Sequence, residues 1–148
     1  MKEQFVDYNT AFELKGKGFN DECFGYYNKL PNEKTFTLFG LNTKGQGSYS
    51  NDSLWGKKDY ACAAPISSQV VDWFRVKHNI DIIILNKYER PNVGYYAEIK
   101  YARKDTLNKD NYYQVTLKEY PEYDRGVFEP GTYREAMKKA IEEALKLV

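Results

Sequence analysis

The sequence has few of the residues from which metal and catalytic sites are usually built. It contains one histidine, His78, and two cysteines, Cys23 and Cys62, that stand far apart along the chain. Two cysteines at this separation do not indicate a disulfide framework, and a reducing compartment is the default expectation. Without a second histidine or a close cysteine pair there is no zinc-ligand spacing, so we expect no metal and no cofactor.

Two further features are missing: an excess of charge of either sign and a long apolar run. The formal net charge is +1, with basic and acidic residues interspersed. Nucleic-acid binders usually carry a basic excess or stripe, so the composition argues against a nucleic-acid partner. No window has the length of a transmembrane helix, and the first twenty residues are too charged for a signal peptide. We therefore expect a soluble, cytoplasmic protein with no membrane partner.

Tyrosine, by contrast, is abundant, since the chain has 14 tyrosines, 8 phenylalanines and 2 tryptophans. A tyrosine side chain has a large apolar body and a polar tip, which suits half-buried sheet faces and interfaces. The composition is therefore consistent with strands on a sheet that has one wet face. It is also consistent with a dedicated aromatic binding surface.

The stretch from Ala64 to Tyr101 predicts a helix followed by two strands. A helix over 65–78 is indicated by apolar residues at helical spacing, namely Ile66, Val70, Trp73 and Phe74. Pro65 suits the first helical position and Asn79 suits a left-handed cap. The strand 81–88 that follows is apolar on both faces at its centre, which predicts an inner strand.

Other strands are indicated by alternating or aromatic-rich segments. Residues 95–102 alternate, with Tyr96, Glu98 and Lys100 on a solvated face, and predict an antiparallel hairpin with the preceding strand. Residues 112–118 alternate again, with Tyr113, Val115 and Leu117 directed inward. Residues 23–29 and 35–39 predict a second hairpin.

Capping signals predict two more helices. Asp7 is an N-cap for a helix over 8–17 whose apolar side consists of Tyr8, Ala11, Phe12 and Leu14. Gly18 then suits the left-handed position of a Schellman ending, with Phe19 folding back toward Leu14. Near the C-terminus, Thr132 and Glu135 form a capping box for a helix over 133–147.

Together these elements predict an α+β fold in a single domain, 1–148. We expect a mostly antiparallel sheet of about five strands, packed by the central helix 65–78 and the C-terminal helix 133–147, with a short N-terminal helix. The glycine- and serine-rich segment 40–58 is predicted to be a long loop held to the body by Leu54 and Trp55.

Three segments carry a family resemblance: Leu14 to Phe19, Ala64-Pro65 leading into Gln69 to Ile80, and Tyr133 to Leu145. With these segments the chain resembles a group of small uncharacterised α+β proteins of gut Bacteroidetes and their phages or integrated elements. The resemblance implies an origin in a phage or mobile element and an α+β fold. The group has no assigned activity, so the resemblance transfers no catalytic residue.

Candidate chemistry is sparse. His78 ends a helix, where a cation meets the negative end of the helix dipole, and a capping role competes with that of a general base. Cys62 precedes a predicted helix N-terminus, where a thiolate is stabilised, but its small neutral neighbours favour a packed thiol. The segment from Gly40 to Ser48 lacks the Gly-Lys-Ser/Thr core of a phosphate-binding loop.

Three functions remain open at this point. The first is a non-enzymatic module for protein interaction or self-association, for which the candidate surface residues are Trp55, Tyr96, Lys100, Tyr112 and Lys118. The second is single-stranded nucleic-acid binding through the sheet face that carries the same tyrosines and lysines. The third is a small enzyme that uses Cys62 or His78, although the absence of a catalytic constellation favours a protein that is not an enzyme.

Overall fold

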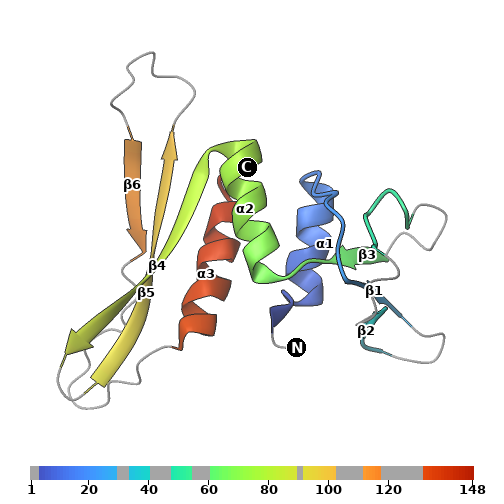
Figure 1. The fold of residues 1–148 in the computed structure, drawn as a ribbon, viewed down its shortest axis with the longest axis horizontal. Coiled ribbons are helices and arrows are strands. Elements are labelled where there is room, and N and C mark those ends of the chain that lie inside the picture. The colour runs from blue at the N-terminus through green and yellow to red at the C-terminus, as the bar shows by residue number, and fades with distance from the viewer. Residues whose placement is uncertain are drawn as a thin grey trace. The chain divides into compact units, whose positions relative to one another are not determined.

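The computed structural model describes residues 4–29, 34–40, 48–54, 61–89, 92–102, 112–117 and 132–148 (Figure 1). The chain divides into two compact units, Met1–Val70 and Val71–Val148, and each is described by itself. The expectation of a single domain stays a prediction. None of the described helices is long and apolar enough to cross a membrane.

The first unit consists of helix α1 and a small antiparallel sheet. Helix α1 spans Tyr8–Gly16, and the strands are β1 (Gly25–Asn28), β2 (Thr37–Phe39) and β3 (Cys62–Ala64). The strand order is β2-β1-β3, and α1 packs against β3. The predicted hairpin is therefore confirmed as the β1–β2 pair, whereas sequence patterning missed β3, because its three small residues show no alternation.

The two ends of α1 follow the capping prediction. The carboxylate of Asp7 accepts from the backbone N–H of Thr10 at 3.0 Å. Gly18 has a φ of 88°, and its N–H donates to the carbonyl of Lys15 while the N–H of Phe19 donates to that of Leu14. This hydrogen-bond pair defines a Schellman ending, so the predicted turn is confirmed.

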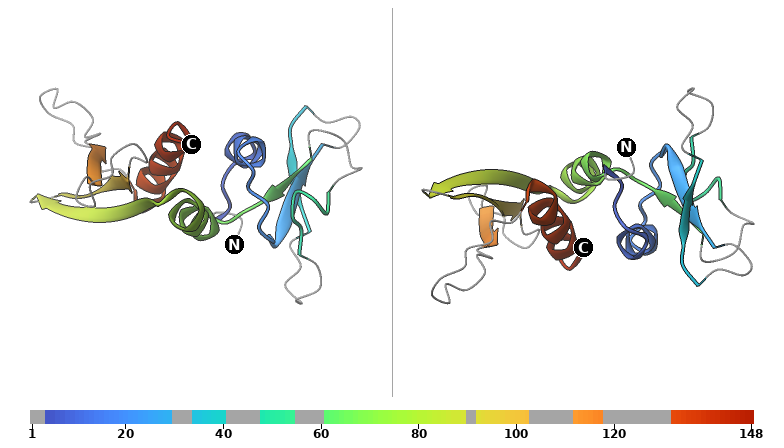
Figure 2. Two further views of the ribbon diagram at one scale, coloured as in Figure 1. Left: turned by 90° about the horizontal axis from the view of Figure 1, so that it is seen from above. Right: turned by 90° about the horizontal axis from the view of Figure 1, so that it is seen from below.

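The second unit contains most of helix α2 (Ser67–His78), three strands and helix α3 (Tyr133–Leu145). The strands are β4 (Ile80–Glu89), β5 (Asn92–Ala102) and β6 (Tyr112–Leu117), in the antiparallel order β4-β5-β6. Helix α3 packs against β5 and β4 and lies beside their ribbon in all the views of Figures 1 and 2. The capping box at Thr132 and Glu135 is present, as predicted.

The core of the second unit lies between this sheet and α3. The strand register puts Ile82 opposite Ile99 and Ile84 opposite Ala97, and Val115 of β6 pairs with Ile99 on the same face. Ile82, Ala97 and Ile99 are buried, as is the small-residue stripe of α3, which consists of Ala136, Ala140, Ile141, Ala144 and Leu145. The alternation predicted for β5 is therefore confirmed at Ala97 and Ile99, whereas the inward direction predicted for the β6 side chains stays a prediction.

Two features of the predicted architecture are wrong, and one helix boundary differs. Instead of one sheet of about five strands there are two separate three-stranded sheets. Helix α2 begins at Ser67 rather than Pro65, and the backbone N–H of Ile66 donates to the Gln69 side chain at 3.1 Å. Strand β4 lies at the edge of its described sheet rather than inside it, although its centre is apolar on both faces.

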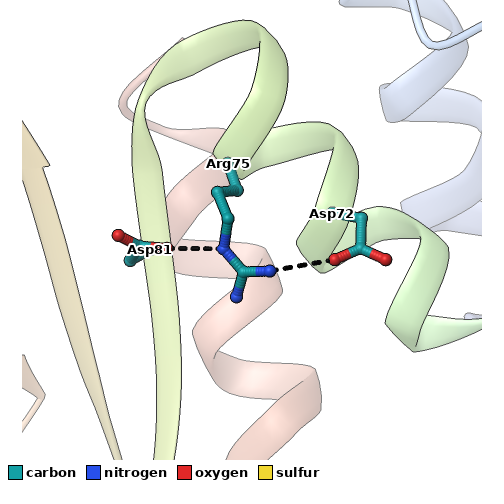
Figure 3. A network of polar contacts seen from close by, with 3 residues as sticks. All are labelled: Asp72, Arg75 and Asp81. Atoms are coloured by element: carbon teal, nitrogen blue, oxygen red, sulfur yellow. Dashed lines mark hydrogen bonds and ion pairs between the residues drawn. The ribbon is translucent and has the colours of Figure 1, made fainter.

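Helix α2 and strand β4 are joined by a left-handed residue and a charged bridge. Asn79 has a φ of 53°, as predicted for the cap. The Arg75 guanidinium lies between two carboxylates, 3.1 Å from Asp72 on the same helix and 2.7 Å from Asp81 on β4 (Figure 3). The hydrogen bond to Asp81 raises the pKa of Arg75. All three side chains are exposed, and exposed ion pairs contribute little to stability. The bridge therefore mainly orients the junction between α2 and β4.

Candidate interaction surface

An aromatic row on the first unit is the clearest candidate site. It consists of Phe12, Tyr8 and Phe36, with the ring centroids of Phe12 and Tyr8 5.6 Å apart and those of Tyr8 and Phe36 3.4 Å apart. The rings of Tyr8 and Phe36 are nearly parallel, at 4°. Phe12 is 43% exposed, so part of the row faces solvent.

The row forms because a helix face and a sheet edge meet. Tyr8 and Phe12 are four residues apart on α1, so their side chains lie on one face of the helix. Pairing of β2 with β1 brings the neighbouring Phe36 to that face. Tyr27 of β1 supports the row from beneath, with its ring edge-on to Tyr8 at 5.9 Å and its hydroxyl donating to the carbonyl of Val6 at 2.5 Å.

An ammonium group flanks each end of the aromatic row. The Nζ atom of Lys15 lies 5.9 Å from the centre of the Phe12 ring, and Nζ of Lys29 lies at the same distance from the Phe36 ring. Lys15 is fixed in place, since its Nζ also donates to the carbonyl of Ala61 at 2.8 Å. The arrangement is therefore apolar at its centre and positively charged at its ends.

A second aromatic cluster surrounds Tyr26, the neighbour of Tyr27 in β1. Successive residues in a strand point to opposite faces, so Tyr26 lies on the face opposite the aromatic row. Its ring centroid is 5.7 Å from that of Phe39 and 4.8 Å from that of Tyr49. All three side chains are half-buried. We therefore interpret this cluster as packing that holds the segment around Tyr49 to the sheet.

The surface residues predicted from the sequence are placed only in part. Tyr96, Lys100 and Tyr112 hold register positions on one face of the β4-β5-β6 sheet, since Tyr112 is opposite Ala102 and alternate residues share a face. Trp55 and Lys118 lie outside the described residues. The role of these residues as an interaction surface stays a prediction, and the sequence analysis missed the aromatic row.

Charges on that face compensate one another. Nζ of Lys100 is 3.7 Å from the Glu98 carboxylate, and Asp81 is the register partner of Lys100 on β4. An anionic nucleic-acid strand would meet the carboxylates of Asp81 and Glu98 beside Lys100. The described charges thus do not form the basic groove typical of single-strand binders.

Cys62 and His78 occupy packed positions in different units. Cys62 is in β3 rather than in a turn before a helix, and burial raises the pKa of its thiol to about 12, so it is protonated at neutral pH. His78 is half-buried, with its ring 4.5 Å from that of Trp73 and 6.3 Å from that of Phe74. Within the described part of the chain there is no cluster of three metal-ligating side chains.

The segment from Gly40 to Ser48, which lacks the core of a phosphate-binding loop, lies almost wholly outside the described residues, since only Gly40 and Ser48 of it are described. No family model, curated protein or solved structure matches this chain. We therefore infer function from the structure alone, starting from the aromatic row.

Proposed function

We propose that this protein is a non-enzymatic interaction module that binds a protein partner through the aromatic row. The observation that carries the proposal is the run of Phe12, Tyr8 and Phe36 between two ammonium groups, with Phe12 substantially exposed. Aromatic side chains are enriched in protein interfaces and are frequent anchors within them.

The stacking within the row favours a protein over a nucleic acid. Bases bind single-strand proteins by stacking on open ring faces. Here Tyr8 and Phe36 cover one face of each other, and Lys29 lies over the Phe36 ring. Ring edges and the exposed Phe12 suit insertion among side chains better than they suit stacking of successive bases.

The flanking charges define the chemistry of the partner. Lys15 and Lys29 lie at opposite ends of an apolar centre, so a partner surface with apolar side chains between carboxylates would be complementary. The resemblance to mobile-element proteins supports a role as an accessory protein of a phage or integrated element. The two free cysteines, Cys23 and Cys62, support action in a reducing cytoplasm.

The proposal is tested by site-specific photo-crosslinking in cells of the source organism. A photoreactive phenylalanine analogue at position 12 should yield a discrete cross-linked protein that resists nuclease treatment. The control is the same analogue at Val76, which is 74% exposed on the second unit. Adding Lys15→Glu with Lys29→Glu should abolish the cross-link at position 12, because it reverses both flanking charges.

Two outcomes would contradict the proposal. The first is equal cross-linking from positions 12 and 76, which would mean that Phe12 reports only general exposure. The second is a cross-linked species that disappears on nuclease treatment, which would favour the nucleic-acid alternative. Folding of each variant is checked by circular dichroism before the comparison.

A further inference from the structure

Strand β4 lies at an edge of its described sheet, and one side of its backbone has no described strand paired with it. β4 is ten residues long and, among the residues that the structure describes, it pairs with β5 alone. In an antiparallel sheet, alternate residues direct their N–H and C=O groups to opposite sides of the strand. Half of the backbone polar groups of β4 therefore point away from β5, toward a side where no described strand pairs.

The side chains of β4 are unusual for an edge. Native proteins protect edge strands with charges, prolines or short lengths, whereas the centre of β4 is Ile82-Ile83-Ile84-Leu85. Ile82 is buried, and the other three are half-buried on the two faces of the sheet. A long β-branched edge of this kind is a template for pairing with another strand.

Strand β3, an edge strand of the first sheet, shows the contrast. In β3, the backbone N–H of Ala63 donates to the side-chain oxygen of Asn51 at 2.9 Å, so a side chain occupies that edge. β3 is also only three residues long and fully buried. The described residues provide no such side-chain cap for β4.

We propose that β4 pairs antiparallel with β4 of a second copy of this chain, in a register centred on Ile84. A two-fold axis must pass through a residue that pairs with itself, so each register is named by its central residue. Centring on Ile84 pairs Ile83 with Leu85 and Asp81 with Lys87 of the second copy. The acid–base pair occurs twice, once on each side of the axis.

The neighbouring symmetric registers lack this complementarity. Centring on Ile83 puts Asp81 opposite Leu85, and centring on Leu85 puts Asp81 opposite Glu89, an acid against an acid. Like charges directly opposite destabilise a strand pair, whereas opposite charges stabilise it. Arg75 binds Oδ1 of Asp81, and a carboxylate accepts on both oxygens, so the bridge at the corner is compatible with a second cation.

The resulting assembly is a continuous six-stranded antiparallel sheet. Residues directly opposite each other in a pair share a face, so the axis perpendicular to the sheet puts both copies of α3 on the same side. The apolar edge would be covered and its backbone groups paired. The aromatic row belongs to the first unit and is not required for this contact.

Sedimentation equilibrium of the full chain tests the association. The wild-type mass should rise with concentration from 17.3 kDa toward twice that value. Lys87→Asp should weaken the dimer about tenfold, since it places like charges opposite each other twice, and adding Asp81→Lys should restore it. Arg75→Gln is the control, because it removes the contact of Asp81 within the chain while leaving the proposed pair.

Cross-linking tests the register. With Ile84→Cys, mild oxidation should produce a covalent dimer, because the two new thiols are directly opposite across the axis. With Asn86→Cys, on the same face but paired with Ile82 of the second copy, it should not. A mass that stays at the monomer value at every concentration overturns the proposal, as does equal cross-linking of the two variants or a double charge swap that fails to restore association.

Discussion

The ring of Tyr49 lies directly against the backbone of Gly40. A Cβ atom at Gly40 would be 2.6 Å from Cε2 of that ring, and Gly40 has a φ of +77°. The position therefore requires glycine for two reasons, the left-handed backbone and the close approach of the ring. Since Tyr49 also packs on Tyr26, this contact fixes the chain after β2 to the sheet of the first unit.

Gly40→Ala should consequently lower the free energy of unfolding by about 2–3 kcal/mol, from backbone strain and overpacking together. Gly18→Ala separates the two causes, because Gly18 has a φ of +88° but nothing within 4 Å of a Cβ. It should cost about 1 kcal/mol. Urea unfolding measures both, and equal losses for the two variants would mean that the Tyr49 contact contributes nothing.

The N-terminal cap of α3 gives a pH-dependent prediction. Glu135 accepts hydrogen bonds from the backbone N–H of Thr132 at 2.7 Å and from its hydroxyl at 3.1 Å, and these lower the pKa of the carboxyl below its usual value of 4.5. The pKa of Glu135 is thus lower in the folded protein than in the unfolded chain. The ionised carboxyl therefore stabilises the folded protein fully at a pH above the unfolded-state pKa, and this stabilisation is lost as the pH falls through the folded-state pKa.

Glu135→Gln keeps an acceptor at this position and removes the titration, so its urea midpoint should fall less steeply between about pH 5 and about pH 3 than that of the wild type. Glu142→Gln, on the same helix but away from the cap, is the control. If both variants change the acid dependence equally, the effect belongs to net charge and not to the capping box.

The two cysteines should be unreactive in the folded protein. Cys23 and Cys62 are both buried, and desolvation is the main cause that raises each thiol pKa to about 12. Both thiols are therefore protonated at pH 8, and thiolates are the reactive form. A thiol-specific reagent should label both residues on unfolding, whereas an exposed thiol introduced by Val76→Cys should react at once.

The same pKa shift predicts alkaline sensitivity. The pKa of the Cys62 thiol is near 9 in the unfolded chain and about 12 in the folded protein. The protonated thiol therefore contributes fully to stability below pH 9, and this contribution is lost as the pH rises toward 12. Cys62→Ala removes the ionisable group, so its stability should decline less than that of the wild type above pH 9. Parallel declines would contradict an ionisation at this site.

The features that sequence patterning predicted are those fixed by neighbouring residues. The caps at Asp7, Gly18, Asn79 and Thr132 each depend on contacts within five positions of the chain, and all four are present. The alternation of β5 was likewise sufficient to assign its buried face. In these cases local geometry and burial favour the same structure.

What patterning could not predict depends on which distant segments pair. The apolar run of β4 looks the same for an inner strand and for an edge strand that is half-buried on both faces. Phe12 was placed on the apolar side of its helix with Tyr8 but is 43% exposed, and the ring stacked on Tyr8 comes from Phe36, more than twenty residues away. Neither the division into two sheets nor the aromatic row has a signature within one window of sequence.

A buried amide joins three segments of the first unit and supplies the last prediction. Asn51 donates through Nδ2 to the carbonyl of Phe19 at 2.6 Å and accepts at Oδ1 from the N–H of Ala63 at 2.9 Å. Asn51→Ala leaves both backbone groups without this partner, which should cost about 2–4 kcal/mol in urea unfolding. The matched control is Asn20→Ala, since Asn20 makes a similar pair of bonds to Asp52 at the surface.

Asn51→Asp distinguishes the two bonds, because it keeps the acceptor for Ala63 and replaces the donor to Phe19 with a second acceptor. The buried carboxyl regains a donor only when protonated, so the stability deficit of Asn51→Asp should shrink as the pH falls, whereas that of Asn51→Ala should not. If the deficit of Asn51→Asp is independent of pH, or if Asn20→Ala costs as much as Asn51→Ala, burial of this amide does not determine its contribution.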